Sequence, residues 1–305
     1  MIKILYIPNS SMGICYWRIE NYAQTLLKFK KRCAVHVDYI FHPSDGIAWD
    51  KVCLEDNDMS RRIQERLSAA FDLYDVIIFQ RIQYKEGLAL LKKYREKHKE
   101  TLIIAEIDDS VPDVPPSNIQ FRKFKDHASC TAEHLQISDG VICSTRYLEA
   151  SVLKFNDNTI VMPNCINWNT WKINNFLRSK PSRYFRIGYV GASGHDEDLL
   201  IAYRAMLKIF KLRADVKFVI RYGGLKPSYL KPHKQIDFEQ VIWHIEKYPN
   251  NLKKLCIDLA LAPLRDTDFN RCKSNLKWIE WSSMGVPLLA SDVEPYRETL
   301  GLIYL

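Results

Sequence analysis

The sequence of 305 residues lacks the patterns that would place it in a membrane or on a secretory route. No apolar run approaches the roughly 18 residues that a membrane-spanning helix needs. The N-terminal stretch MIKILYIPNSS carries one lysine and a short apolar run, but no small-residue cleavage site follows it. We therefore interpret this stretch as a first strand and not as a signal peptide, and we expect a cytoplasmic chain.

Closely paired cysteines are also lacking. The eight cysteines stand apart, and no two of them make the C-x-x-C spacing that is typical of a zinc site. Several lie inside apolar segments, such as Cys143 in GVICST, which favours buried free thiols in a reducing compartment. The chain has no internal repeat and no low-complexity tract, so neither a solenoid nor a biased tail is expected.

What is present is the composition of a globular chain long enough for two domains. Hydrophobic residues make up 47% and charged residues 26%. The formal net charge is +8, and such an excess attracts polyanions: nucleic acid, an anionic membrane surface or phosphorylated substrates. The cations are spread along the chain, with short clusters at 28–32 (KFKKR) and 92–99 (KKYREKHK). Solvated helix faces are the simpler interpretation of both clusters.

Strands and helices are predicted to alternate along the whole chain. Apolar runs predict strands at 2–8, 33–40, 75–80, 101–107, 140–145, 159–164, 186–191, 216–223, 241–245, 257–264 and 287–291. Helical patterns cover 18–31, 85–98, 120–137, 146–154, 196–212, 249–255 and 273–284. Near-continuous apolar strands that alternate with helices are typical of parallel sheets with both faces covered.

A polar stretch at 172–183, rich in Asn, Lys, Ser and Pro, interrupts this alternation. We place the interdomain linker there. The sequence therefore predicts an α/β fold in which two doubly wound parallel-sheet (Rossmann-like) domains, residues 1–171 and 184–305, face each other across a cleft.

Ligands of such sheets bind at the carboxyl ends of the strands, so polar residues and glycines at those ends are candidates. The first is the loop that holds Ser11, Met12 and Gly13, after the first strand. Gly13 either lets the backbone approach a ligand or only makes a turn. No G-x-G-x-x-G follows the strand, so the dinucleotide fingerprint is absent.

The second candidate is the acidic run EIDD, which follows the strand at 101–107. Glu106, Asp108 and Asp109 place three carboxylates within four residues, and neighbouring negative charges raise the pKa of such groups. A functional role and simple surface solvation are both open here.

The third candidate is GYVGASGHDEDL at 188–199. Gly191, Ser193, Gly194 and His195 lie in a tight turn between a strand and a helix start, where backbone N–H groups can hold a phosphate. The three acids that follow suit the positive end of the helix dipole in any case. A metal site here would need a matched distant ligand, which the sequence does not provide.

The fourth candidate is NRCKSNLKWIEWSSMGVPLLASD at 270–292. In a helix that begins at residue 273, Lys273, Lys277 and Glu280 share one face, and Trp278 and Trp281 turn toward the core. A salt-bridged surface face is the alternative. Because the helix is predicted to start at the ligand-binding edge, its two ammonium groups suit a diphosphate and its carboxylate suits ribose hydroxyls.

This stretch also resembles the donor-binding half of GT-B glycosyltransferases, in particular family 4 and its relatives. Those proteins show a glutamate followed by glycine five residues on and proline seven residues on, and Glu280, Gly285 and Pro287 match this spacing. IGYVGASGHDEDL is similar to the first strand and phosphate loop of the same domain, and AEIDDSVPDVP is similar to part of the acceptor domain.

The resemblance implies transfer of a sugar from a UDP- or GDP-linked nucleotide-sugar, with retention, without a metal or another cofactor. Lys273, Lys277 and the turn at 191–195 would then hold the diphosphate, and Glu280 the ribose. Asp108 and Asp109 would be the catalytic carboxylates, and the acceptor is a glycan, a lipid-linked saccharide, a protein or modified DNA. Contact with an anionic membrane surface or with nucleic acid is a further expectation from the basic charge.

Two departures from the family pattern are visible. The family often has an earlier glutamate eight residues before the position of Glu280, and here that position is Cys272, so its sugar contact is vacant or filled by a neighbour such as Asn275. The sequence also ends at GLIYL, before the terminal crossover helix that the family leads us to expect. Two alternatives therefore stay open: a non-catalytic nucleotide-sugar-binding protein and a sugar epimerase of the same fold.

Overall fold

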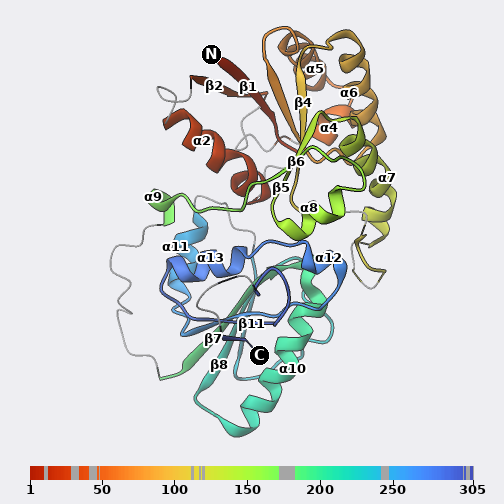
Figure 1. The fold of residues 1–305 in the computed structure, drawn as a ribbon. Coiled ribbons are helices and arrows are strands. Elements are labelled where there is room, and N and C mark those ends of the chain that lie inside the picture. The colour runs from red at the N-terminus through yellow and green to blue at the C-terminus, as the bar shows by residue number, and fades with distance from the viewer. Residues whose placement is uncertain are drawn as a thin grey trace. The chain divides into compact units, whose positions relative to one another are not determined.

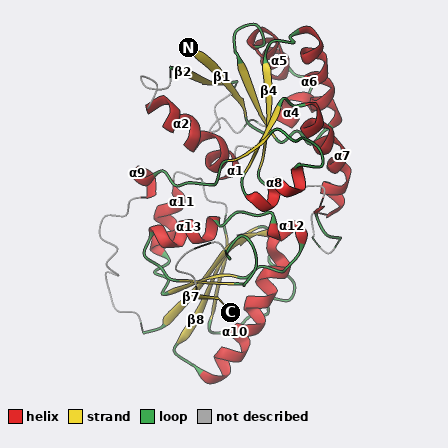
Figure 2. Cartoon of the chain, viewed as in Figure 1, coloured by secondary structure: helices red, strands yellow, loops and turns green. Residues whose placement is uncertain are grey.

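The computed structural model describes the chain except residues 10–12, 29–33, 41–46, 48, 111–112, 117, 119–120, 172–182, 242–246, 298, 300–302 and 305. The chain forms two compact units, each with its own sheet and helices (Figure 2). The first unit comprises Met1–Val114, Lys123–Cys165 and Cys272–Ser274, and the second comprises Pro115–Arg122, Ile166–Arg271 and Asn275–Leu305.

The first unit is built on six parallel strands in the order β2-β1-β3-β4-β5-β6. The strands are β1 (Ile2–Ile7), β2 (Val35–Tyr39), β3 (Val76–Gln80), β4 (Leu102–Ile107), β5 (Gly140–Cys143) and β6 (Thr159–Val161). The register places Ile4 of β1 opposite Val37 of β2 and Val76 of β3. Since all strands run the same way, their carboxyl ends form one edge of the sheet.

Helices cover both faces of this sheet, because side chains alternate between the faces along each strand. Leu5 and Ile7 pack with α4, α5 and α6 on one face, whereas Tyr6 packs with η1 and α2 on the other (Figure 1). The helices are α1 (Gly13–Cys15), the π-helix η1 (Tyr16–Glu20), α2 (Asn21–Lys28), α4 (Trp49–Leu54), α5 (Asp58–Ala70), α6 (Lys85–Lys97), α7 (Phe121–Ile137) and α8 (Arg146–Val152). This double cover explains the continuous apolar runs of β1, β3 and β4.

The second unit also has six parallel strands, in the order β12-β11-β10-β7-β8-β9. They are β7 (Phe185–Ala192), β8 (Val216–Gly223), β9 (Ile236–Gln240), β10 (Leu259–Ala262), β11 (Leu288–Ala290) and β12 (Ile303–Tyr304). The helical elements are α9 (Trp168–Trp171), the 3-10 turn η4 (Ser193–His195), α10 (Asp196–Leu212), α11 (Tyr248–Lys254), α12 (Asp268–Arg271) and α13 (Leu276–Ser283).

Helix α10 covers one face of the second sheet. It buries Leu199 and Met206 against Tyr189 of β7 and Phe218 of β8. The rings of Tyr189 and Phe218 are fully buried, and such large aromatic side chains contribute strongly to packing. The central strand β7 therefore places its carboxyl end, and the turn that follows it, beside the start of α10.

The predicted α/β fold with two doubly wound parallel sheets is confirmed. Helices α4 and α5 were not predicted, although Ile63, Leu67 and Ala70 of α5 stand at helical spacings of four and three and are buried. The strand predicted at 241–245 lies, except for Val241, outside the described residues, and β9 precedes it. The predicted linker at 172–183 lies outside them too, except for Arg183.

Within the described residues, every helix is too short or too polar to cross a bilayer. The cysteines of that part are free thiols, and Cys15, Cys143 and Cys272 are buried. Burial raises the pKa of the Cys143 thiol to about 12, so this thiol stays protonated.

Candidate functional site

Strand β7 requires glycine at Gly191, which lies near the end of the strand and not in the turn after it. A Cβ on Gly191 would lie 2.6 Å from the hydroxyl oxygen of Tyr189, so a larger residue would displace a fully buried ring. The turn after β7 runs through Ser193 and Gly194 into α10. The carbonyl of Gly194 accepts a hydrogen bond from the Asn118 side chain at 3.3 Å. Backbone N–H groups at the start of a helix such as α10 suit an anionic ligand.

The three acids of the first turn of α10 each have a partner. Asp196 accepts from the hydroxyl of Tyr222, and Glu197 pairs with Arg265 at 2.5 Å. Glu197 therefore has a cation as its partner, whereas Asp196 has a neutral hydroxyl donor. The helix dipole favours acids at these positions but does not account for their side-chain partners.

Asp198 is the most connected of the three and is 3% exposed. Its Oδ1 accepts from the backbone N–H of Arg265 at 2.8 Å and lies 3.4 Å from the Asn270 amide. Its Oδ2 lies 2.8 Å from Nδ1 of His195. Asp198 thus joins the turn after β7 to the loop after β10, and it orients the His195 ring.

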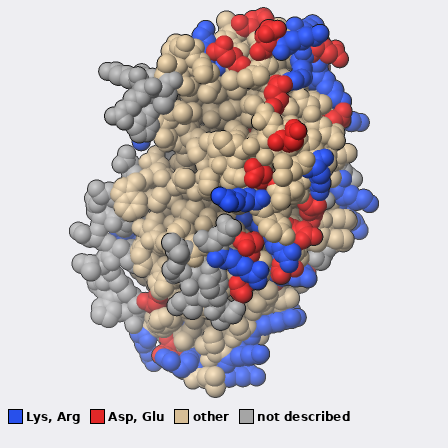
Figure 3. Space-filling model, viewed as in Figure 1, with Lys and Arg blue, Asp and Glu red and all other residues tan. Residues whose placement is uncertain are grey.

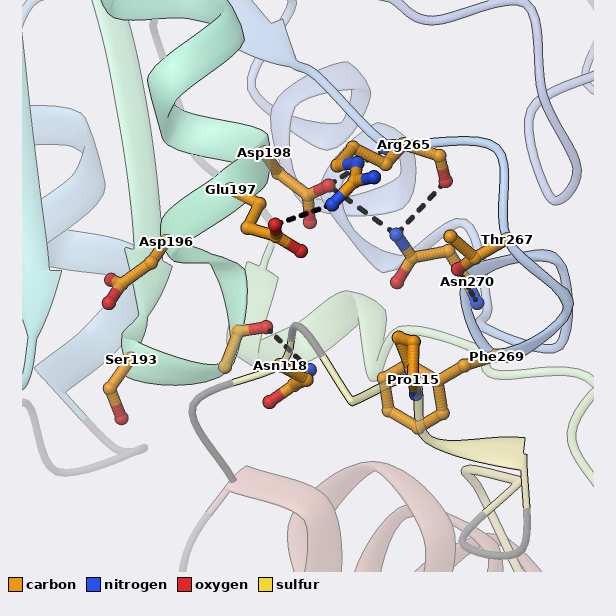
Figure 4. A pocket seen from close by; sticks show the side chains of 11 residues that line it. Pro115, Asn118, Ser193, Asp196, Glu197, Asp198, Arg265, Thr267, Phe269 and Asn270 are labelled. Atoms are coloured by element: carbon orange, nitrogen blue, oxygen red, sulfur yellow. Dashed lines mark hydrogen bonds and ion pairs between the residues drawn. The ribbon is translucent and has the colours of Figure 1, made fainter. Parts of the chain in front are cut away.

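Asp198, Arg265 and Asn270 line a pocket that belongs wholly to the second unit (Figure 4). Its empty volume is about 470 Å³, part of which is open to solvent. Polar groups on its wall come from three segments, the turn after β7, the loop after β10 and the segment around Asn118. Pro115 and Phe269 supply its apolar side. Three carboxylates, one arginine and several neutral polar groups face a space large enough for a small polar ligand.

Helix α13 contributes Lys277 and Glu280. The Nζ of Lys277 lies 5.8 Å from the centre of the Tyr189 ring, the same ring that Gly191 accommodates. This distance is within the range of a cation–π contact. The structure therefore brings the predicted turn residue Gly191 and the predicted helix residue Lys277 to one aromatic ring.

Glu280 is 7% exposed and accepts a hydrogen bond from the hydroxyl of Tyr248 at 3.1 Å. Burial raises the pKa of Glu280 to about 7, against the opposing effects of the Lys277 charge and the Tyr248 hydrogen bond. The carboxyl is therefore poised to change its protonation near neutral pH. Tyr248 was missed by sequence analysis, because nothing in the segment around it marks it as a partner of a residue 32 positions away.

The prediction that Lys273 shares a helix face with Lys277 and Glu280 is wrong. Helix α13 begins at Leu276, so Lys273 precedes it. Lys273 belongs to the first unit and pairs there with Asp109 at 3.3 Å. Trp281 is buried as predicted, whereas Trp278 is only half-buried. The Asn275 amide, just before the helix, donates to the Thr299 hydroxyl at 3.3 Å.

In the first unit, Asp108 and Asp109 follow β4 as predicted. Arg81, directly after β3, lies 3.2 Å from Asp108 and 4.0 Å from Asp109. Burial, more than the charge of Asp109, raises the pKa of Asp108, and Arg81 opposes this rise. The structure thus assembles two carboxylates with Arg81 and Lys273 at one edge of the sheet. The acids were predicted from their position at the carboxyl end of a strand. Arg81 has such a position too, after β3, so the same argument could have predicted it.

Glu106, the third acid of the run, has a different environment from its two neighbours. It forms a buried ion pair with Arg18 of η1, with Nε and Oε1 2.6 Å apart and both side chains 1% exposed. Arg18 also donates to the carbonyl of Met162 and to the Asn164 amide oxygen. Burial raises the pKa of Glu106 to about 7 although Arg18 opposes the rise. This carboxylate ties η1 and β6 to the sheet, so its role is internal.

Gly13 begins α1 with no strained backbone dihedral, and a Cβ added there would meet nothing within 4 Å. Neither the backbone nor packing therefore requires glycine at this position. Ser11 and Met12 of the same predicted loop lie outside the described residues. In the part of the chain that the structure describes, no group of three His, Cys, Asp or Glu side chains is arranged to hold a metal.

Comparisons with known proteins give matches in structure alone. No protein-family model matches the chain, and no curated protein matches it. The catalytic domain of starch synthase IV from Arabidopsis thaliana, solved with ADP and acarbose, is similar with a TM-score of 0.60 and 12% identity over 97% of this chain and 84% of that one. Sucrose-phosphate synthase from Thermosynechococcus elongatus is similar with a TM-score of 0.58 and 13% identity over 97% and 83%.

TarM is similar with a TM-score of 0.53 and 13% identity over 75% of this chain. The chain spans only 44% of the length of TarM. These neighbours share one architecture. The chain has the GT-B fold. At such low identities the likeness concerns the fold, so the predicted fold class is confirmed, and membership of family 4 stays a prediction.

Proposed function

We propose that this GT-B chain is a glycosyltransferase that moves a sugar from a nucleotide-sugar donor to an acceptor, with retention and without a bound metal. The GT-B fold supports glycosyl transfer as the class of reaction, since the similar starch synthase was solved with a nucleotide and a saccharide. The observation that carries the proposal is the convergence of Lys277, Glu280 and Gly191 of β7 around Tyr189 and Tyr248.

On the donor side, Glu280 would accept hydrogen bonds from the ribose hydroxyls of a UDP- or GDP-linked sugar. The carboxyl of Glu280 is buried but lies next to the half-buried Tyr248. A ligand would supply the remaining hydrogen-bond donors to this carboxyl. A hydrogen bond to a charged carboxylate stabilises a complex by about 1.5–3 kcal/mol. Asn275, just before α13, and His195, held by Asp198, would orient the donor sugar.

The diphosphate would be held by Lys277 and by the backbone N–H groups of Ser193 and Gly194. The leaving group gains negative charge as the sugar–phosphate bond breaks, and fixed positive charge lowers that barrier most when it is placed in advance. Lys273 is a second source of such charge in the proposal, released from Asp109 or shared with it.

On the acceptor side, Asp108 or Asp109 would accept the proton of the acceptor hydroxyl or hydrogen-bond the transferred sugar. The pKa of Asp108, raised by burial, and its ion pair with Arg81 support a role beyond surface solvation, because perturbed carboxyls gather at functional sites. The acceptor class stays open among glycans, lipid-linked saccharides, proteins and modified DNA.

A second candidate function is a nucleotide-sugar-binding protein without turnover, and Cys272 favours it. This residue stands where related sequences place a sugar-contacting glutamate, and it is 1% exposed within a core cluster. A buried thiol cannot make that contact. Asn275 would have to supply it if the chain is active.

The test is a panel of UDP-, GDP- and ADP-sugars in a thermal-shift assay, followed by product analysis with and without acceptors. A ligand of the folded state raises the melting temperature. We expect one nucleotide class to stabilise the wild type and to lose about 10- to 100-fold in affinity in Glu280→Ala. The exposed Glu65→Ala is the matched control and should bind normally.

Stabilisation without a product on any acceptor would favour the binding protein. A changed sugar formed from donor alone would identify an epimerase. No stabilisation by any nucleotide-sugar would contradict the proposal as a whole.

A further inference from the structure

The positive charge of the chain is concentrated on one side of the second unit. From Leu199 to Ile236 the sequence contains nine lysines and arginines and one acid, Asp215, so this stretch alone carries a formal charge of +8. That value equals the net charge of the whole chain. The stretch comprises most of α10, all of β8 and the connection at 224–235 that leads into β9.

The connection at 224–235 runs alongside α10, which makes the two segments one surface. The backbone N–H of Lys231 donates to the Tyr203 hydroxyl at 3.3 Å. Further along, the rings of His233 and Phe210 stack with centroids 4.7 Å apart and planes 12° apart. Contacts near the middle and near the end of α10 therefore hold the connection against the helix.

Cations stand on the outer side of both segments. Arg204, Lys208 and Lys211 occupy exposed positions of α10 at spacings of four and three, so they form one row along the helix. Lys226, Lys231 and Lys234 are exposed on the connection. We call these six residues the basic face. Lysine and arginine side chains are visible along α10 at the lower right in Figure 3.

Nearby carboxylates do not neutralise the basic face. Asp215 pairs with Arg213, and Asp237 and Glu239 of β9 pair with Arg221. Among the described residues, none of the six cations forms an ion pair with an acid. Lys226 lies 5.3 Å from the centre of the Phe238 ring, and a row of cations without carboxylate partners attracts an extended anionic surface.

Large apolar side chains stand at the ends of this surface, exposed to solvent. Leu212, at the end of α10, is 82% exposed, and Leu225, at the start of the connection, is 85% exposed. Ile201, on the exposed side of α10, is 45% exposed. A helix of 17 residues is about 25 Å long, so the basic face extends well away from the turn where α10 begins.

We propose that the basic face docks on an anionic lipid surface, with the lysines at the headgroup phosphates and Leu212 and Leu225 inserted among the headgroups. Lysine clusters next to exposed leucines suit this surface. The anionic headgroups attract the lysines, and burial of the leucine side chains away from water lowers the free energy. A nucleic acid backbone would use the cations but give the two aliphatic side chains nothing to contact. This proposal does not depend on glycosyl transfer.

The test is co-sedimentation of the full chain with vesicles of phosphatidylcholine alone or with about a third of phosphatidylglycerol. We expect binding to the anionic vesicles only. Lys208→Gln with Lys211→Gln should lower the partition coefficient by about 25-fold, since each lysine near an anionic surface contributes about fivefold. Leu212→Ser should lower it further, without changing binding to duplex DNA.

The matched control is Lys93→Gln with Lys97→Gln on α6, which removes the same charge from exposed positions of the first unit. It should bind vesicles as the wild type does. Equal losses in the two double variants would overturn the proposal, because binding would then follow net charge alone. Absence of vesicle binding would overturn it, and so would duplex DNA binding of equal strength with no effect of Leu212→Ser, which would identify a nucleic acid partner.

Discussion

The hydroxyl of Tyr248 donates a hydrogen bond to Oε2 of Glu280 at 3.1 Å, and the ring of Tyr248 rests edge-on against the fully buried Trp171, 5.9 Å between centroids. Trp171 therefore holds the ring of Tyr248, and the hydroxyl of Tyr248 holds the carboxylate of Glu280. In the proposed function Tyr248 is a positioning residue for the donor ribose.

The first prediction concerns this hydrogen bond. Tyr248 lowers the pKa of Glu280, so Tyr248→Phe should raise that pKa above its value of about 7. The ionised carboxylate is the better acceptor for ribose hydroxyls, so donor affinity of the variant should fall near neutral pH and recover at higher pH. Calorimetric titrations from about pH 6 to about pH 9 check this. Wild-type and variant profiles that stay parallel would refute it.

The second prediction concerns stability and pH. Burial raises the folded-state pKa of Glu280 from 4.5 to about 7, so the folded state binds more protons than the unfolded state between these values. The contribution of the neutral acid is fully present below about pH 4.5 and is lost as pH rises toward 7.

Glu280→Gln carries no titrating proton, so its melting temperature should fall less than that of the wild type between about pH 5 and about pH 8. Glu106, with a similarly raised pKa, retains its own share of the dependence in this variant. Identical slopes for the two proteins would show that Glu280 is already ionised at low pH.

The third prediction separates the two lysines. Lys277→Ala should bring the affinities for a nucleoside diphosphate and its nucleoside closer together, because the ammonium interacts with the diphosphate alone. Lys277→Arg should reduce the affinity for the diphosphate less than Lys277→Ala does. It should not restore it fully, since the planar guanidinium group differs in shape from the compact ammonium group. Adding Lys273→Ala should complete the convergence if both lysines hold the diphosphate. An unchanged preference for the diphosphate in the double variant would place the phosphates elsewhere.

The fourth prediction tests the acids after β4. Asp109→Asn should leave donor affinity within a few-fold while turnover falls by about 100-fold or more, the usual scale of general acid–base catalysis. Asp113→Asn is the matched control, since Asp113 hydrogen-bonds Ser151 and the nearby loop. The control should lower stability and leave turnover per folded molecule unchanged. The same pattern in Asp109→Asn would remove this residue from the site.

The fifth prediction concerns the buried pair of Arg18 and Glu106. Arg18→Met should destabilise the fold by about 3–5 kcal/mol, because it leaves a carboxyl buried without its partner. Arg18→Met combined with Glu106→Met should be less destabilised than the sum of the two single variants. Denaturant unfolding of the four proteins gives the coupling energy. Additive effects would mean that the ion pair contributes nothing beyond its separate contacts.

Strands β1, β3, β4, β7 and β8 were predictable because sheets covered on both faces need continuous apolar runs. The start of α13 was not. Lys273 and Lys277 stand at helical spacing, and periodicity alone cannot tell that Lys273 lies outside the helix, in the first unit, where it pairs with Asp109.

The candidate site residues also differ in how far the sequence could predict them. The turn of Ser193, Gly194 and His195 could be predicted from sequence, because a turn between a strand and a helix has a local signature, and the ligand-binding role of these residues stays a prediction. The partners of Asp198 and Glu106 could not, since they lie 67 and 88 residues away. The basic face also escaped sequence analysis, because its cations are separated along the chain and gather only when the connection at 224–235 folds against α10.

Cys272–Ser274 belongs to the first unit although the residues on either side belong to the second. The backbone passes from one unit to the other five times along its length, at 114–115, 122–123, 165–166, 271–272 and 274–275. Cutting the chain once would therefore give two incomplete fragments. The N-terminal fragment would lack the buried Cys272 of its own core. Each fragment would need the other fragment to complete its fold.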